Sequence, residues 1–149
     1  MKSTKFTTLA LAAVLSLSMG AAVFAATLTP EQAVADRQAA MKADGRALKG
    51  AGDLSRDKAV AVLTLVAANY AKLPGLFPKD SITDKSEALP VIWQQFDQFS
   101  AIFAKGEAAA TDGLAAAKAG DTAKYQADLK IIYGTCDACH NTYRAKKDS

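Results

Sequence analysis

The residues best suited to chemistry lie close together near the end of the chain. The 149-residue sequence has two cysteines and one histidine, which are Cys136, Cys139 and His140. They form the pattern C-x-x-C-H, in which two thiols can form thioethers to one porphyrin while the next imidazole reaches its iron. Residues three positions apart share a face of a helix, so the spacing suits this attachment. The sequence therefore predicts one covalently attached haem c per chain, with His140 as an iron ligand.

The cysteine pair has three alternative uses, and each fits the sequence less well. A disulfide would close a very short loop, would stabilise the fold little and would be awkward on a helix. A thioredoxin-like redox pair needs a βαβ context, and no alternating strand pattern precedes the motif. A structural zinc site takes four protein ligands, whereas the motif supplies three. Haem attachment is the favoured reading, and these three remain as alternatives.

The first 25 residues have the order of a secretory signal peptide. Two lysines precede an apolar run at positions 9–17, and Val-Phe-Ala precedes the expected cut. Cleavage between Ala25 and Ala26 would remove residues 1–25 and leave residues 26–149 as the mature periplasmic domain. No second apolar segment is long enough to cross a bilayer, so we expect no membrane span after processing.

Composition limits the partners of the mature domain. The chain is 50% hydrophobic and 22% charged, which suits one globular domain of ordinary size. Two of its 18 basic residues lie in the signal segment, so the mature domain carries nearly balanced charge. A nucleic-acid-binding protein would need a basic stripe or a series of stacking aromatics, and neither occurs. We therefore expect no nucleic-acid partner.

The mature sequence has a helical pattern almost throughout. A first helix is expected to begin at the capping box of residues 29–32, with proline at its first position, and to end at the glycine-rich turn 50–52. A second helix, capped by Ser55 or Asp53, is expected to stop at Pro74. Both carry apolar residues at helical spacing along one face.

The second half of the mature sequence predicts a loop and two more helices. Residues 73–89 contain prolines and charges and read as a long ordered loop. A third helix is expected to begin at Pro90, with Gly106 and Gly113 as places for a bend or break. Asp121 or the next residue caps a fourth helix, whose inner face carries the haem motif. Four amphipathic helices with short turns predict an all-α, antiparallel four-helix bundle with covalent haem near its C-terminal helix.

The order of these motifs resembles the class II c-type cytochromes, the cytochrome c-prime family. The resemblance covers residues 30–147, and its carriers are Arg-Gln-Ala-Ala-Met-Lys at 37–42, Leu-Pro before the loop, Ile-Trp at 92–93 and the C-terminal Cys-x-x-Cys-His-x-x-Tyr-Arg. It implies a four-helix bundle that carries haem near its C-terminus. It also implies arginines beside the haem, so Arg37 and Arg144 are candidates to pair with a propionate or to lie near the proximal imidazole. The alternative is that both are solvated surface residues.

Met41 decides the expected chemistry of the iron. In one branch of the family, a bulky apolar residue of the first helix covers a five-coordinate, high-spin haem that binds nitric oxide or carbon monoxide. In the low-spin branch, a methionine of that helix ligates the iron. Met41 occupies the corresponding position four residues after Arg37, so the chain resembles the low-spin branch. Met41 is also the only methionine of residues 26–149, and core packing is the alternative role.

A His140/Met41 pair would close the iron to other ligands. The expected function is therefore a periplasmic mono-haem one-electron carrier, and not an enzyme, because no open coordination site or general base is evident. The alternative is a five-coordinate gas-binding cytochrome of the same family. Trp93, with Phe96 and Tyr143, is expected to wall the haem. We expect one redox protein to donate the electron and another to accept it. Basic residues near the haem would steer an acidic partner to the site. Whether the chain forms a homodimer is left open.

Overall fold

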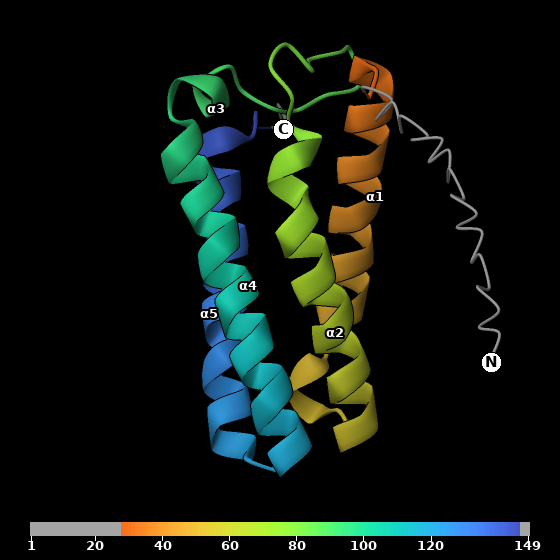
Figure 1. The fold of residues 1–149 in the computed structure, drawn as a ribbon, viewed down its shortest axis with the longest axis vertical. Coiled ribbons are helices and arrows are strands. Elements are labelled where there is room, and N and C mark those ends of the chain that lie inside the picture. Colours follow the sequence, from red (N-terminus) through yellow and green to blue (C-terminus); the bar gives the residue numbers. More distant parts are fainter. Residues whose placement is uncertain (1–27, 147–149) are drawn as a thin grey trace, which may run out of the picture.

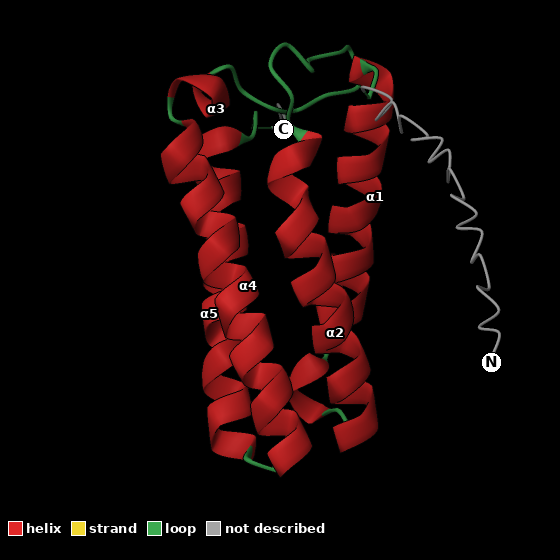
Figure 2. Ribbon diagram, in the orientation of Figure 1, coloured by secondary structure: helices red, strands yellow, loops and turns green. Residues whose placement is uncertain are grey.

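The computed structural model describes residues 28–146, and throughout this range the architecture is helical (Figures 1 and 2). Two 3-10 turns and one short helix connect four long helices, in the order α1 (Pro30–Leu48), η1 (Ala51–Asp53), α2 (Arg56–Lys72), η2 (Leu73–Leu76), α3 (Val91–Gln94), α4 (Phe96–Ala119) and α5 (Thr122–Tyr143). Successive long helices run in opposite directions (Figure 1). The predicted all-α, antiparallel four-helix bundle is confirmed. The expected signal peptide, residues 1–25, lies outside the described residues.

Local sequence sets both ends of α1. The Thr29 hydroxyl accepts a 3.2 Å hydrogen bond from the Gln32 N–H, and the Gln32 side chain accepts one of 3.1 Å from the Thr29 N–H. These two bonds satisfy N–H groups that the first turn leaves without helical partners. The helix ends at Leu48, and Gly50 follows with a φ of 71°, which glycine adopts without steric cost. The predicted start and end of the first helix are confirmed.

The second helix is apolar enough to raise the question of a membrane. Together α2 and η2 span Arg56–Leu76 with a mean hydropathy of 1.4, so the stretch could cross a bilayer by length and composition alone. The expectation that no such segment follows the signal is therefore wrong. In the structure, however, Leu63, Val66 and Tyr70 of this helix are buried, and the helix packs on α1 and α4. One face of the stretch therefore belongs to the core of the bundle, and 33% of its most apolar window is buried.

The third long helix differs from the predicted one. Its break lies at Gln95, which separates α3 from α4, and α4 continues without interruption through Gly106 and Gly113. The indole N–H of Trp93 donates to two loop carbonyls, which holds α3 against the loop and out of line with α4 (Figure 1). The glycines instead allow close packing, because a Cβ at Gly113 would lie 3.0 Å from Leu63 Cδ1. Nothing in the sequence around Gln95 marks the break.

The long connection between α2 and α3 is fastened to the end of α5. The Leu89 N–H donates to the Tyr143 carbonyl at 3.0 Å, and the Ala145 N–H donates to the Glu87 carbonyl at 2.8 Å. We call residues 77–90 the connecting loop. It lies across the end of the bundle at which α5 finishes (Figure 1).

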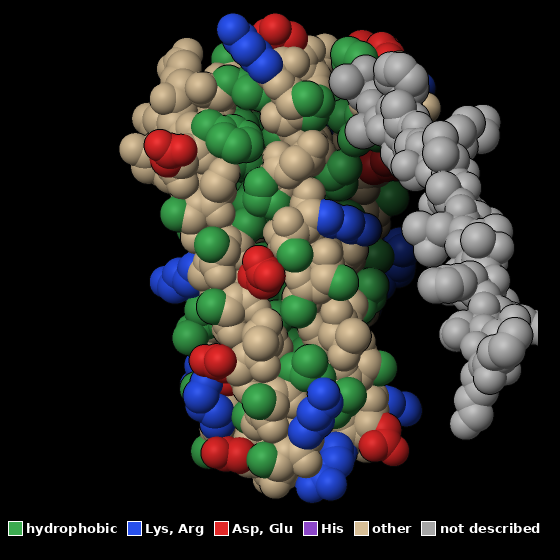
Figure 3. All heavy atoms as spheres, in the orientation of Figure 1, with side chains coloured by type: hydrophobic (Ala, Val, Ile, Leu, Met, Phe, Trp, Pro, Cys, Tyr) green, Lys and Arg blue, Asp and Glu red, His purple; other side chains and the backbone are tan. Residues whose placement is uncertain are grey.

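The surface carries mixed charge. On the face shown in Figure 3, acidic and basic side chains are interspersed with exposed hydrophobic ones, and they do not gather into a stripe of one sign. This distribution agrees with the nearly balanced charge of the mature sequence. It gives no support to nucleic-acid binding on this face.

Candidate haem site

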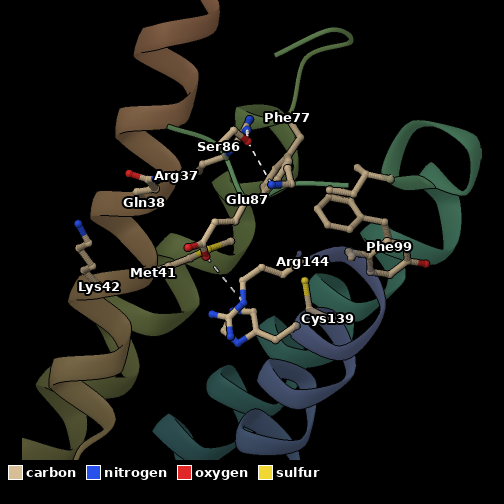
Figure 4. Close-up of a pocket in the computed structure, with 14 residues that line it drawn as sticks. Arg37, Gln38, Met41, Lys42, Phe77, Ser86, Glu87, Phe99, Cys139 and Arg144 are labelled. Atoms are coloured by element: carbon tan, nitrogen blue, oxygen red, sulfur yellow. Dashed lines mark hydrogen bonds and ion pairs between the residues drawn. The ribbon is translucent and has the colours of Figure 1, made fainter. Parts of the chain in front are cut away.

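A cavity of about 410 Å³ lies at the end of the bundle that carries the connecting loop (Figure 4). Side chains from α1, the connecting loop and α5 surround it. The lining residues are Arg37, Gln38, Met41, Lys42, Phe77, Ser86, Glu87, Ala88, Ile92, Phe99, Cys139, His140, Tyr143 and Arg144. Cofactor and small-molecule sites usually measure about 300–1,000 Å³. The structure thus brings five of the predicted site residues to one cavity, which are Arg37, Met41, Cys139, His140 and Arg144.

The C-terminal part of α5 presents Cys139 and His140 to this cavity as neutral groups. Burial lowers the pKa of His140, and the charge of Arg144 acts in the same direction, so the imidazole keeps a free lone pair at neutral pH. Burial raises the pKa of the Cys139 thiol to about 11, so the thiol stays protonated. Neutral imidazole is the form that ligates iron. The imidazole is therefore in the state that iron ligation requires.

Cys136 lies one helical turn before Cys139 but is not among the lining residues. Its sulfur is 3.4 Å from the Tyr70 hydroxyl, which comes from α2. Both cysteines are free thiols, so no disulfide joins them. Within residues 28–146, no group of three or more His, Cys, Asp or Glu side chains could hold a metal ion, and no strand supplies a βαβ context. The structure thus supports none of the three alternatives to haem attachment.

Met41 lies on the α1 side of the cavity, across from the α5 residues (Figure 4). Its side chain is half-buried and also packs against the hydrophobic core of the bundle. The predicted placement of Met41 on the inner stripe of the first helix is confirmed. Its position suits a side chain that covers one face of a group held from α5.

Arg37 is buried and organises the connecting loop. Only 3% of the residue is exposed, and its guanidinium donates to Leu76 O at 3.1 Å, Ser81 Oγ at 2.8 Å, Ser81 O at 2.7 Å and Ser86 Oγ at 2.8 Å. The same group lies 4.4 Å from the centre of the Phe77 ring, within cation–π distance. Arg37 is therefore not a solvated surface residue. Three of its hydrogen bonds hold the connecting loop and a fourth holds the end of η2, so its charge stays at the cavity wall.

Arg144 lies at the edge of the cavity with Glu87. The guanidinium Nε and a Glu87 carboxylate oxygen are 4.0 Å apart, and both side chains are about half exposed. An exposed ion pair of this length contributes little to stability. Arg144 is therefore free to reorient toward an anionic group in the cavity, as its predicted role requires.

Trp93 does not line the cavity. Its indole N–H donates to Phe77 O and Pro78 O, both at 3.1 Å, so the side chain fastens α3 to the connecting loop. Phe96 is 37% exposed and is also absent from the lining. Of the three aromatics expected to wall the haem, the structure places Tyr143 alone at the cavity.

Sequence reasoning missed the contribution of the connecting loop. Phe77, Ser86, Glu87 and Ala88 all line the cavity. The length of the predicted loop signalled a role, because loops of that length usually pack on something or function. Individual loop residues could not be identified, since they reach the cavity only through contacts with α1 and α5.

The residues present fit an iron porphyrin. Cys139 and Cys136, one turn apart on α5, can supply two thioethers, and His140 follows directly. Phe77 and Phe99 offer apolar contact to the macrocycle. Arginine and lysine side chains at the rim suit its carboxylates.

Comparison with known proteins points to the same cofactor. The family model described as cytochrome C' matches residues 30–144. A cytochrome c' of Rhodopseudomonas palustris is 38% identical over 122 residues, which cover 76% of this chain and 82% of the relative. A cytochrome c-556 of Agrobacterium tumefaciens is 37% identical over 99 residues, which cover 66% of this chain and 80% of the relative.

Solved structures share the fold. A cytochrome c' with ligand-controlled dimer dissociation matches with a TM-score of 0.73 at 22% identity and covers 81% of this chain and 100% of its own. The nitric oxide complex of a variant cytochrome c prime from Alcaligenes xylosoxidans matches with a TM-score of 0.68 at 27% identity, covering 81% of this chain and 99% of its own. The first of these likenesses shows the bundle fold alone.

These matches correct the expected chemistry of the iron. The family model and the Rhodopseudomonas relative carry the name cytochrome c', and such proteins are typically high-spin with five-coordinate iron. The expectation of a low-spin, His140/Met41-ligated electron carrier is therefore wrong. The spacing from Arg37 located Met41 on α1, but spacing does not determine whether its sulfur binds iron. With 30–144 matched, the chain belongs to the cytochrome c' family of class II c-type cytochromes, which carry one covalently attached haem c per chain.

Proposed function

We propose that the protein is a periplasmic mono-haem cytochrome c' whose five-coordinate iron binds a small neutral gas such as nitric oxide or carbon monoxide. The observation that carries this proposal is that Met41 of α1 and His140 of α5 line one cavity from opposite helices. A mutant of the cytochrome c prime from Alcaligenes xylosoxidans was solved as a nitric oxide complex, which supports the choice of ligand. The haem, when bound, supplies the iron that takes the gas.

Residues on the two sides of the cavity have different proposed roles, iron ligation on the α5 side and covering of the gas site on the α1 side. His140, the one histidine of the sequence, would hold the iron from α5. Met41 covers the opposite side, and Ile92 and Phe99 add apolar surface. An apolar cover excludes water and ions while it admits a small uncharged molecule.

Two polar side chains near Met41, those of Gln38 and Arg37, donate to the backbone or side chains of other elements. The Gln38 amide donates to Lys85 O at 2.8 Å, and Arg37 donates to the connecting loop. Hydrogen-bond donors on the distal side favour bound oxygen, whose charge separation they stabilise. Because Gln38 and Arg37 donate elsewhere, neither amide nor guanidinium is directed at a ligand beside Met41, which favours carbon monoxide and nitric oxide over oxygen.

Location and assembly belong to the same proposal. Residues 1–25 direct export and are removed at Ala25, and the four-helix domain acts in the periplasm. A redox protein, acidic if the basic residues of α1 steer it, reduces the iron. A homodimer is part of the same proposal. With His140 as iron ligand and no second histidine to act as base, we infer binding rather than enzymatic turnover.

Gas binding tests the proposal directly. Exported holoprotein is reduced and titrated with carbon monoxide, and the visible spectrum is recorded together with that of the oxidised form. We expect a high-spin oxidised spectrum and saturable carbon monoxide binding. Met41→Ala should accelerate gas binding because it removes the cover, while Met41→Leu, which keeps the bulk without the sulfur, should leave the oxidised spectrum unchanged.

A specific result would overturn the proposal. If the oxidised wild type shows a sulfur-to-iron absorption band that Met41→Leu abolishes, and the reduced wild type does not take up carbon monoxide, the iron is six-coordinate.

A further inference from the structure

Tyr70 connects α2 to the haem-bearing helix through a buried hydroxyl. The residue is 5% exposed, and its hydroxyl oxygen lies 3.2 Å from Thr135 Oγ1 and 3.4 Å from Cys136 Sγ. Thr135 is 4% exposed, and its own hydroxyl donates to Ile132 O at 2.6 Å. A chain of three hydrogen bonds thus begins at the Cys136 sulfur and ends at a carbonyl of α5.

The donor and acceptor in each of these three hydrogen bonds follow from the number of protons that the side chains carry. A carbonyl only accepts, so the single hydroxyl proton of Thr135 is used on Ile132 O. Thr135 Oγ1 must then accept from Tyr70, and the Tyr70 oxygen accepts from the Cys136 S–H. Burial raises the pKa of Tyr70 well above its ordinary value, so the phenol keeps its proton. A thioether sulfur has no proton, so after haem attachment Thr135 Oγ1 and the sulfur compete for the one proton that Tyr70 can donate.

The surrounding helices hold the Tyr70 ring in place. A Cβ on Gly106 of α4 would overlap the ring and would lie 3.1 Å from Thr135 Oγ1. Phe103, one turn earlier on α4, contacts the ring edge to face with centroids 5.7 Å apart. Glycine is a poorer helix former than alanine, but its lack of a Cβ leaves the space through which Tyr70 reaches α5. The hydroxyl is therefore held at a fixed place beside Cys136.

We propose that Tyr70 is a positioning residue for Cys136, whose sulfur it holds in place at the point where the chain is joined to the haem. In that joining the Cys136 thiol adds across a vinyl group: the S–H bond breaks, an S–C bond forms at one vinyl carbon, and the hydrogen goes to the other. The addition needs no oxidant or reductant. Cys139 lines the cavity itself, so the two points of attachment are held by different means.

Two substitutions with opposite effects test this role in the holoprotein, made in a host that attaches haem. Tyr70→Phe keeps the ring and its contacts but removes the hydrogen bond to the sulfur. Thr135→Val removes the competing acceptor, so the Tyr70 proton is donated to the sulfur alone. We expect the carbon–sulfur vibration of one thioether, measured by resonance Raman spectroscopy, to shift in opposite directions in the two variants. Peptide mapping confirms that both cysteines carry haem.

Tyr125→Phe is the matched control. Tyr125 is also 5% exposed, and its hydroxyl donates to Ala51 O near the turn between α1 and α2. This control should leave the vibration unchanged. Unchanged vibrations in both test variants, or shifts of the same sign, would overturn the proposal, because Tyr70 would then act by packing alone. If Tyr70→Phe does not accumulate as holoprotein, Thr135→Val decides by the presence or absence of its shift. The test does not involve gas binding, so it is independent of the proposed function.

Discussion

Asn69 donates a 2.6 Å hydrogen bond from Nδ2 to one carboxylate oxygen of Asp44, and the other oxygen of Asp44 is buried without a hydrogen-bond partner in residues 28–146. Asp44 is 5% exposed and lies on α1, one turn after Met41. Burial raises its pKa from 3.8 to about 6, against the opposing effects of the Asn69 hydrogen bond and the Lys72 charge. The ionised form is costly because half of the carboxylate is unsatisfied.

The pair predicts that stability falls as the pH rises. The pKa of Asp44 is higher in the folded state than in the unfolded state. The protonated carboxyl therefore contributes fully to the free energy of unfolding below about pH 4, and this contribution is lost as the pH rises through about 6. Asp44→Asn should therefore make the protein about 2 kcal/mol more stable than the wild type near neutral pH. The difference should vanish near the unfolded pKa.

Guanidinium unfolding of the holoprotein at several pH values measures this effect. Asp36→Asn, at an exposed position of the same helix, is the control and should follow the wild type. Parallel pH profiles for Asp44→Asn and the wild type would show that Asp44 does not titrate as described.

Gly106 should not tolerate a side chain, although alanine is the better helix former. Gly106→Ala gains up to about 1 kcal/mol of helix propensity but forces Tyr70 to move, and overpacking of this kind costs about 1–3 kcal/mol. We expect net destabilisation, measured by thermal unfolding. Gly45→Ala on α1 has no atom within 4 Å of the new Cβ and should stabilise the protein. If both substitutions stabilise, the contact between α4 and Tyr70 is looser than the structure shows.

Arg37→Lys should loosen the connecting loop although the charge is kept. Lysine cannot reproduce the planar fork that bonds Leu76, Ser81 and Ser86, so we expect a loss of about 2–4 kcal/mol. Amide hydrogen exchange at Ser81 and Ser86, whose N–H groups donate to Pro78 O and Thr83 O, should accelerate. Arg46→Lys, at an exposed position of α1, should change neither quantity.

Loss of the haem should weaken the bundle as a whole. The chain is rich in alanine, and the cavity of about 410 Å³ lies among Phe77, Phe99 and Tyr143, which would lose their apolar contact. The exported Cys136→Ala/Cys139→Ala double variant should unfold at a lower temperature and less cooperatively than the wild type, as followed by far-UV circular dichroism. Equal midpoints and equal steepness would contradict this expectation.

The sequence predicted features that depend on near neighbours in the chain. The capping box at Thr29, the positive φ at Gly50 and the cysteine pair with His140 all rely on residues a few positions apart. Helical periodicity likewise located Met41 on the inner face of α1. These features need no knowledge of how the helices pack.

The features that the sequence did not reveal depend on contacts across the fold. Arg37 is buried because acceptors 39–49 residues later surround it. Gly106 was expected to mark a break, but its role depends on Tyr70 of another helix. Trp93 was expected to line the haem site because aromatic side chains often pack around such cofactors, whereas its indole N–H donates to carbonyls of the connecting loop. Periodicity identifies a buried face but does not reveal which partner covers it.

The way Arg37 is held affects any change of charge at the iron. Because three of its hydrogen bonds go to the connecting loop and a fourth goes to Leu76 O of η2, the guanidinium cannot swing out toward solvent when the iron gains or loses an electron. Its positive charge acts as a constant electric field on the cavity. A dipole or charge that is fixed in advance needs no rearrangement when the reaction occurs, so Arg37 should keep the reorganisation energy of the redox step low.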